Sequence, residues 1–180
     1  FDVKFPQLLT KSIIQNEGIP IMSKTGHSFI KEKIKELGAL LGGEMSGHIF
    51  FNDRWPGFDD AIYAGARMLE IISQNPLGGK IFQDLPTLSS TPEINLKAED
   101  SEKFEIVEKF KNMITFPEAN IVDLDGIRIE FENGWGLLRA SNTSPVLVLR
   151  FEAKDQVELE KIKNIFKKTL EKIDPELINF

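Results

Sequence analysis

Three segments of the sequence combine polar side chains with glycines or hydroxyls where no apolar pattern demands them. They are residues 24–28 (KTGHS), residues 42–48 (GGEMSGH) and residues 139–145 (RASNTSP). Carboxylates, hydroxyls and imidazoles hydrogen-bond to polar ligands, and arginine binds phosphate through a planar fork of N–H donors. These segments are therefore the candidates for chemistry in this chain.

Residues 24–28 lie between a predicted strand and a predicted helix. Ligands bind at that edge of α/β sheets, and the N-terminus of a helix favours anions. A simple capped turn explains the same residues, with Ser28 as the helix cap and His27 on the surface. The local pattern leaves both interpretations open.

Residues 42–48 place Glu44, Ser46 and His48 between glycines, which allow unusual backbone angles. On an extended segment Glu44 and Ser46 point to the same side and could hold adjacent hydroxyls of a sugar. The alternative is a glycine-rich connector with a solvated Glu44. We predict no metal ion here, because Glu44 and His48 lack the helical spacing of a zinc protease pair and the chain has only two histidines.

Residues 139–145 join two predicted strands and place one cation, Arg139, before a row of hydroxyl and amide side chains. An arginine fork, hydroxyls and loop N–H groups together form a cradle for phosphate. The alternative is a polar turn held by hydrogen bonds from side chains to the backbone.

Other polar residues point to structure rather than chemistry. Asp123 and Asp125 resemble part of a metal-binding loop, but no further ligands follow at loop spacing, so a turn is predicted. Asp59 and Asp60 could form a catalytic pair, but one of them, Asp59 or Asp60, is predicted to cap a helix, which explains the pair more simply. Arg128 lies on the polar face of a predicted strand, where we expect a solvated charge.

The first half of the chain alternates short apolar runs with helical patterns. Strands are predicted at residues 1–5, 19–22 and 49–51, and helices at residues 8–14, 29–37 and 62–72. This alternation requires crossover connections, so we predict an α/β domain with a mixed, mostly parallel sheet.

The second half follows a boundary rich in Pro and Ser at residues 83–92 and has a different order. Strands are predicted at residues 93–98, 126–131, 135–139 and 146–151, with a hairpin turn at Asn133 and Gly134. Helices are predicted to begin near Asp100 and at Asp155, where Glu158 completes a capping box. We predict an α+β domain with helices on one face of an antiparallel sheet.

The composition excludes several classes of protein. The chain has 180 residues, a net charge of −6 and no cysteine, which excludes disulfides, thiolate zinc sites and cysteine nucleophiles. Without a basic excess, nucleic acid is not an expected partner.

The longest stretch without Asp, Glu, Lys or Arg, residues 140–149, is too short to cross a membrane. No basic-then-apolar leader opens the chain, so we expect a cytoplasmic protein. Because the first residue is Phe1 rather than Met, we expect the chain to begin inside a longer protein.

Together the three segments resemble the α-D-phosphohexomutase family, and within it the bacterial phosphomannomutase/phosphoglucomutase branch. The resemblance runs over essentially all 180 residues and includes DVK at residues 2–4, GFDDAIYA at residues 57–64 and TPEIN at residues 91–95. GEMSGH and RASNTSP are specific motifs. Met45 favours the mannose/glucose branch, because the phosphoglucosamine branch usually carries Gln at that place.

The resemblance implies two of the family's four domains. Residues 1–86 match the third domain without its opening segment, and residues 91–180 match the complete fourth domain. The fourth domain of the family has a fold like the TATA-binding protein, which is an analogy of fold and implies no DNA binding.

The resemblance also implies roles for individual residues. Glu44 and Ser46 correspond to the pair that grips the sugar hydroxyls, and His48 to a proton-transfer group. The other implied substrate contacts are Lys4 and His27, which line the cleft, and Arg139, Ser141, Asn142 and Thr143, which hold the phosphate that is not being transferred.

The implied reaction moves phosphate between C1 and C6 of a hexose. A phosphoserine donates its phosphoryl group, a hexose 1,6-bisphosphate turns around as the intermediate and activator, and Mg²⁺ neutralises phosphoryl charge. The phosphoserine motif and the magnesium loop belong to the family's first two domains and do not occur in these 180 residues. We therefore expect the parent protein to be an isomerase, an intramolecular phosphotransferase, and this chain alone to be inactive.

Two interpretations of the chain stay open. One is the substrate-recognition part of such a mutase, whose partners are hexose phosphates and the missing N-terminal domains. The other is a stand-alone phosphosugar-binding module or a truncated pseudo-enzyme. The sequence does not select between mannose and glucose, does not fix the oligomeric state, and assigns no role to residues 55–58 (WPGF).

Overall fold

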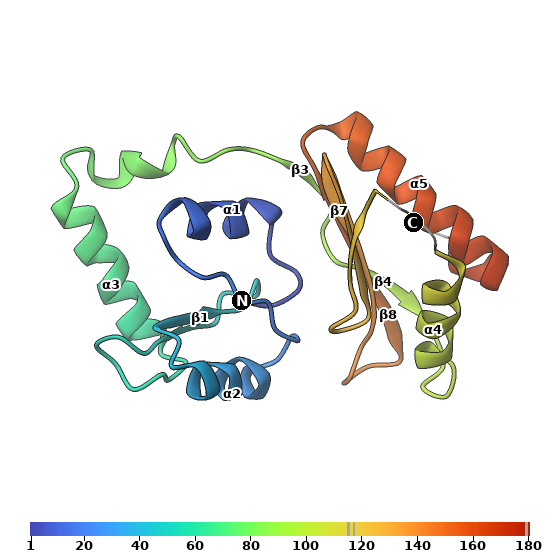
Figure 1. The fold of residues 1–180 in the computed structure, drawn as a ribbon, viewed down its shortest axis with the longest axis horizontal. Helices are drawn as coiled ribbons and strands as arrows, with labels where there is room; N and C mark the ends of the chain where they lie inside the picture. The colour runs from blue at the N-terminus through green and yellow to red at the C-terminus, as the bar shows by residue number, and fades with distance from the viewer. Residues whose placement is uncertain (115, 117, 179) are drawn as a thin grey trace. The chain divides into compact units, whose positions relative to one another are not determined.

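The structure is a computed structural model, and it describes residues 1–114, 116, 118–178 and 180. Over these residues the chain divides into two compact units, Phe1–Thr87 (unit 1) and Leu88–Phe180 (unit 2) (Figure 1). Within the described ranges, no helix has both the length and the apolar character needed to cross a membrane.

Unit 1 combines helices with a short β-hairpin. Its elements are α1 (Gln7–Gln15), α2 (His27–Leu37), β1 (Leu41–Gly43), β2 (Ile49–Phe51), α3 (Ala61–Gln74) and the 3-10 helix η1 (Gly78–Phe82). β1 and β2 pair antiparallel, with Gly43 opposite Ile49. Ile30 and Ile34, which are one turn apart on α2, pack against Phe50 of β2 and form a small core. This core fixes the start of α2 beside the turn of the hairpin.

Unit 1 has the predicted α/β class, but its sheet is not mostly parallel. In the described part of unit 1, the one ladder is the antiparallel pair β1–β2, and the strands predicted at residues 1–5 and 19–22 form only an isolated parallel bridge, Asp2 with Ser23. The N-terminal segment turns at Asp2, because the Asp2 side chain accepts a hydrogen bond from Lys4 N and the Asp2 carbonyl accepts one from Phe5 N. An Asx turn of this kind ends a strand after one bridge.

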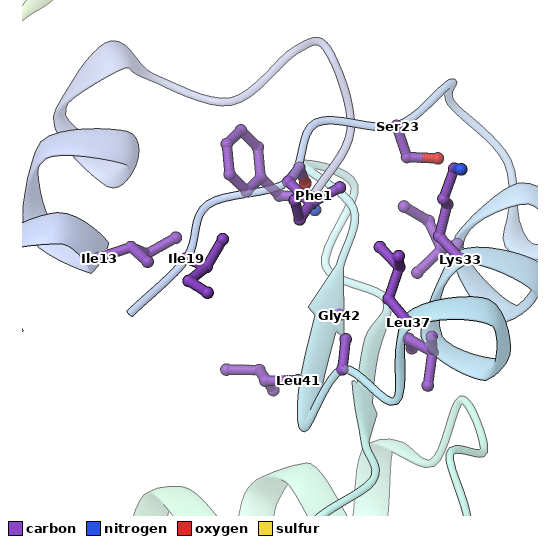
Figure 2. Close-up of a pocket in the computed structure, with 12 residues that line it drawn as sticks. Phe1, Ile13, Ile19, Ser23, Lys33, Leu37, Leu41 and Gly42 are labelled. Atoms are coloured by element: carbon purple, nitrogen blue, oxygen red, sulfur yellow. Dashed lines mark hydrogen bonds between the residues drawn. The ribbon is translucent and has the colours of Figure 1, made fainter. Parts of the chain in front are cut away.

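Unit 1 also contains a small apolar pocket with a volume of about 90 Å³. Figure 2 shows Ile13, Ile19, Leu37 and Leu41 around it. No residue with an implied role in substrate binding lines this pocket, and pockets that hold small molecules usually measure about 300 Å³ or more. We therefore interpret it as a gap between apolar side chains and not as the candidate site.

Unit 2 is an antiparallel sheet with two helices on one face. Its strands are β3 (Ser89–Ser90), β4 (Ile94–Lys97), β5 (Asn120–Val122), β6 (Ile127–Phe131), β7 (Gly134–Ala140) and β8 (Val146–Ala153), and its helices are α4 (Lys103–Met113), α5 (Gln156–Ile173) and the 3-10 helix η2 (Pro175–Ile178). The order across the sheet is β3-β8-β7-β6-β5, and β4 also pairs with β8. Figure 1 shows α4 and α5 on the same side of this sheet. The predicted α+β class is confirmed.

Aromatic side chains hold the helices of unit 2 on the sheet. The Phe166 ring of α5 lies 5.0 Å from the Phe110 ring of α4 and 5.1 Å from the Phe151 ring of β8, measured between centroids. All three side chains are fully buried. At the start of α5, the Asp155 side chain accepts from Glu158 N at 2.9 Å, which confirms the predicted cap.

The β6–β7 hairpin forms as predicted, but its turn lies one residue earlier. Gly134 already pairs with Phe131, so the two turn residues are Glu132 and Asn133. Gly134 is needed for a different reason, since a Cβ there would lie 2.3 Å from the Glu152 carbonyl oxygen of β8. The glycine therefore permits close approach of two strands and does not form the turn itself.

Two short strands of unit 2 were not predicted. β3 lies inside the expected boundary segment and pairs with the end of β8, where Ser89 is opposite Ala153. β5 pairs with β6. Strands of two or three residues show no alternation long enough to be recognised in a sequence.

Candidate functional site

The segment from Glu44 to His48 is the tight turn of the β1–β2 hairpin. Glu44 N donates to the His48 carbonyl and Gly47 N donates to the Glu44 carbonyl, both at 2.9 Å. The expectation of an extended segment was therefore wrong, because these two bonds close the chain on itself. The Glu44 side chain is buried, whereas Ser46 is exposed, so the turn does not present them as an adjacent pair.

The Glu44 carboxylate lies at the N-terminus of α2. Its Oε1 accepts a hydrogen bond from Gly26 N, and its Oε2 is 3.7 Å from His27 Nε2. α2 begins at His27 with Gly26 as its N-cap, so the alternative in which Ser28 caps the helix is wrong. The Glu44 carboxylate, which comes from another segment, binds the N-terminus of α2 instead. The positive end of the helix dipole favours a negative charge at this position.

The imidazole rings of His27 and His48 contact each other, and both lie close to the carboxylate of Asp59. Their ring centroids are 4.0 Å apart, and Asp59 Oδ2 is 2.8 Å from His48 Nδ1 and 3.5 Å from His27 Nε2. Both imidazoles are partly exposed. The fold thus brings the first and second candidate segments together with a third one, from the region before α3.

The prediction that Asp59 or Asp60 caps a helix is confirmed, and the two aspartates have different surroundings. Asp60 caps α3, accepting from Ile62 N and Tyr63 N. Asp59 instead forms an isolated bridge with Phe50 of β2 and faces the two histidines. One aspartate is enough to cap a helix. The presence of two in the sequence was therefore a signal that the other has a different role.

Asp2 is a second residue that the sequence analysis missed. It is fully buried, its Oδ2 is 4.0 Å from Lys4 Nζ, and Thr25 Oγ1 lies 3.5 Å from the same oxygen. Burial raises the pKa of Asp2 above its usual value, although the Lys4 charge and the backbone N–H groups of Lys4 and Met45 oppose the rise. The negative charge of Glu44 raises it further. Through its contacts with Lys4 and Thr25, Asp2 links the candidate residue Lys4 to residues 24–28.

In unit 2, Arg139 and the loop after it form a separate polar group. Arg139 Nε donates to Asp125 Oδ2 at 3.0 Å, and both side chains are largely buried. Ser141 Oγ accepts from the backbone N–H groups of Thr143 and Ser144, at 3.3 and 3.2 Å. Asn142 and Thr143 are exposed. The loop thus contains the hydrogen bonds from a side chain to the backbone that the polar-turn alternative describes, and Arg139 is fixed at its entrance.

Arg128 is not the solvated charge that we expected. Its side chain is 1% exposed, its guanidinium carbon lies 3.9 Å from the centroid of the Trp135 ring, and its Nη2 is 2.8 Å from Glu130 Oε1. Alternation along β6 placed Arg128 opposite the apolar face, but Trp135 of the neighbouring strand covers it. A planar guanidinium is well suited to this stacked position.

The two aspartates of the metal-like segment do not fit a magnesium site. Asp125 is paired with Arg139, and Asp123 Oδ1 lies 2.6 Å from Lys111 Nζ. These cations compete with Mg²⁺ for the two carboxylates, and Mg²⁺ also needs octahedral geometry with several water ligands. The prediction of a turn before a strand agrees with this, because β6 begins at Ile127.

The chain matches two family models and several known proteins. Residues 2–87 match phosphoglucomutase/phosphomannomutase, alpha/beta/alpha domain III, and residues 93–169 match the phosphoglucomutase/phosphomannomutase C-terminal domain. A phosphomannomutase/phosphoglucomutase of Pseudomonas syringae is 52% identical over 178 residues, which are 98% of this chain and 38% of the relative. A phosphoglucomutase of Neisseria gonorrhoeae is 49% identical over 99% of this chain and 39% of its own length.

A solved structure has the same fold. The crystal structure of a phosphoglucomutase/phosphomannomutase family protein from Burkholderia thailandensis superposes with a TM-score of 0.89 and 43% sequence identity, over 97% of this chain and 37% of that one. The chain therefore spans less than two fifths of the length of these relatives.

Proposed function

Because the chain belongs to the phosphoglucomutase/phosphomannomutase family, we propose that it is the sugar- and phosphate-recognition part of a hexose-phosphate mutase. Residues 1–86 are assigned to domain III and residues 91–180 to the C-terminal domain. The whole protein, an isomerase, would interconvert the 1- and 6-phosphates of mannose or glucose through a phosphoserine and a hexose 1,6-bisphosphate. The serine and the Mg²⁺ ligands would belong to its other domains, which are the partners of this chain.

The observation that carries the proposal is the convergence of His27, Glu44 and His48 at the hairpin turn. One ligand atom of each lies within 4.8 Å of the other two. A carboxylate accepts hydrogen bonds from two adjacent sugar hydroxyls, and imidazoles donate to or accept from a third. Gly26 N holds Glu44 in place, so little side-chain freedom is lost when a sugar binds.

His48 is positioned to exchange a proton with a sugar hydroxyl. Asp59 lies at hydrogen-bond distance from His48 Nδ1. If the carboxylate accepts the Nδ1 proton, the other ring nitrogen, Nε2, faces the ligand. Lys4, held by the buried Asp2, would supply positive charge to a phosphate, and exposed Ser46 a hydroxyl contact.

The phosphate that is not transferred would bind at Arg139. Asp125 pairs with Nε of the guanidinium, the nitrogen nearest the main chain. The outer edge of the fork is thus available for two hydrogen bonds to phosphate oxygens. Ser141 shapes the loop so that Asn142 and Thr143 are exposed beside it.

Calorimetric titration of this chain with glucose 6-phosphate tests the proposal. We expect saturable binding that Glu44→Gln weakens by about tenfold or more, since a charged hydrogen bond contributes roughly 1.5–3 kcal/mol. Glu36→Gln, on an exposed glutamate of α2 that pairs with Lys33, is the matched control. Equal affinity of Glu44→Gln and the unsubstituted chain would exclude Glu44 from sugar recognition.

The stand-alone phosphosugar-binding module makes the same binding prediction and a different catalytic one. With Mg²⁺ and glucose 1,6-bisphosphate, this chain should not convert glucose 1-phosphate to glucose 6-phosphate, and turnover by it would contradict our assignment of the serine and metal loop to other domains. The longest protein made from the same reading frame decides between the alternatives. Turnover by that protein supports the mutase, and binding without turnover supports the module.

A further inference from the structure

Two imidazoles and two carboxylates converge at one point of unit 1, where the sequence predicted no metal ion. In the sequence only Glu44 and His48 are close neighbours, but the fold adds His27 and Asp59. His27 Nε2 is 3.7 Å from Glu44 Oε2 and 3.5 Å from Asp59 Oδ2. Ligand atoms on one tetrahedral zinc ion, each about 2.0–2.1 Å from the metal, are roughly 3.3 Å apart. We propose that His27, Glu44 and His48 bind a divalent transition-metal ion of the zinc class, and that Asp59, which lies 2.8 Å from His48 Nδ1, orients that imidazole.

The ligands are held by ordered parts of the fold. Gly26 N binds Oε1 of Glu44, which leaves Oε2 directed at His27. Hydrogen bonds from Glu44 N to the His48 carbonyl and from Gly47 N to the Glu44 carbonyl set the turn. The bridge to Phe50 holds Asp59 beside β2. Contacts that orient ligands in this way raise metal affinity, because less side-chain freedom is lost on binding.

The donor set selects the kind of metal. Imidazole nitrogens with carboxylate oxygens suit Zn²⁺, Co²⁺ and Ni²⁺, whereas Mg²⁺ and Ca²⁺ prefer oxygen ligands alone. This site is therefore distinct from the magnesium site of the proposed mutase. If Glu44 and the imidazoles also bind the sugar, a bound transition metal would exclude it. That consequence rests on the proposed function, whereas metal binding itself does not.

The test is titration of the chain with Co²⁺, followed by its visible absorption, and with Zn²⁺, followed by NMR of the histidine rings. We expect one Co²⁺ per chain with tetrahedral absorption bands, displaced by Zn²⁺ and not by excess Mg²⁺. The chain contains only two histidines, so both ring signals should shift together when Zn²⁺ binds. Zinc that leaves either histidine unshifted, or cobalt that shows no tetrahedral bands, would overturn the proposal.

Variants provide a second measurement on folded protein. His27→Gln and His48→Gln, checked for native circular dichroism, should each weaken cobalt binding by about tenfold or more, and Glu36→Gln should leave it unchanged. Cobalt binding as tight in both histidine variants as in the unsubstituted chain would also overturn the proposal. The titrations contain no sugar phosphate. Failure of metal binding is thereby distinguishable from failure of the proposed function.

Discussion

Arg139 at the end of β7 and Asp125 before β6 form an ion pair, with 3.0 Å between Nε and Oδ2. The approach is close because Gly126, at φ +78°, lies directly against β7. A Cβ at Gly126 would be 2.6 Å from Arg139 Cα. Asp125 therefore orients the guanidinium and leaves its outer edge directed away from the pair.

Replacing Arg139 should weaken the binding of both glucose 1-phosphate and glucose 6-phosphate. We expect Arg139→Ala to lose about ten- to hundredfold in affinity, the value of a charge-assisted hydrogen bond. Arg139→Lys should restore only part of it, because an ammonium lacks the bidentate fork. Calorimetry measures the three affinities. The control is Arg54→Ala, because Arg54 is exposed and pairs with Glu70. If Arg139→Ala bound both sugar phosphates within twofold of the unsubstituted chain, only the polar-turn interpretation of the loop would remain.

Arg128, unlike the exposed control residue Arg54, is buried and contributes to stability. We expect Arg128→Ala to lower the free energy of unfolding of unit 2 by roughly 3–5 kcal/mol, the range for breaking a buried ion pair. The free energy of unfolding of Arg128→Lys should lie between those of Arg128→Ala and the unsubstituted chain. Lysine keeps the charge but loses the flat contact with Trp135. Urea unfolding followed by tryptophan fluorescence measures the change. A transition in Arg128→Ala at the same urea concentration as in Arg54→Ala would show that the stacked pair contributes nothing.

Asp59 and Asp60 should have separable roles despite being neighbours. Asp60→Ala removes the cap of α3 and should lower the unfolding free energy of unit 1 by about 0.5–2 kcal/mol. Asp59→Ala leaves that cap in place and should instead change the NMR shifts of the His48 ring nitrogens, since Asp59 contacts Nδ1. If Asp60→Ala changed the His48 ring and Asp59→Ala the stability of α3, the assignment of the two carboxylates would be reversed.

Glu152 should make the stability of unit 2 depend on pH. Burial raises its pKa above the usual value near 4.5, although the hydrogen bond from Trp135 Nε1 and the charges of Arg150 and Arg128 oppose the rise. Between 4.5 and the raised pKa the folded state binds more protons than the unfolded state. The contribution of Glu152 to the unfolding free energy should therefore increase as the pH falls through that window, and decrease as it rises.

Trp135 fluorescence in a Trp55→Phe background reports this titration directly. We expect a midpoint above 4.5 that disappears in Glu152→Gln, whose amide oxygen still accepts from Trp135. Glu152→Gln should also be less dependent on pH in its unfolding free energy than the chain with Glu152. A midpoint at or below 4.5 would show that the hydrogen bond and the arginines outweigh the effect of burial.

Local pattern was enough to predict the family and most elements of unit 2. The strict alternation at residues 126–131 became β6, the Asp155 cap began α5, and the family matches confirm the resemblance read from the motifs. These signals are strong because hydrogen-bond caps and alternating faces depend on residues that are neighbours in the chain. The same reason explains why KTGHS, GEMSGH and RASNTSP could be singled out before their surroundings were known.

Contacts between distant segments could not be predicted in this way. Thr25 contacts the buried Asp2, Trp135 buries Arg128, and the hairpin turn carries Glu44 to the start of α2. In each case the partner comes from a segment that the local pattern does not connect to the residue. Burial and charge pairing depend on which side chains packing brings within a few ångströms, and only the folded chain defines that arrangement.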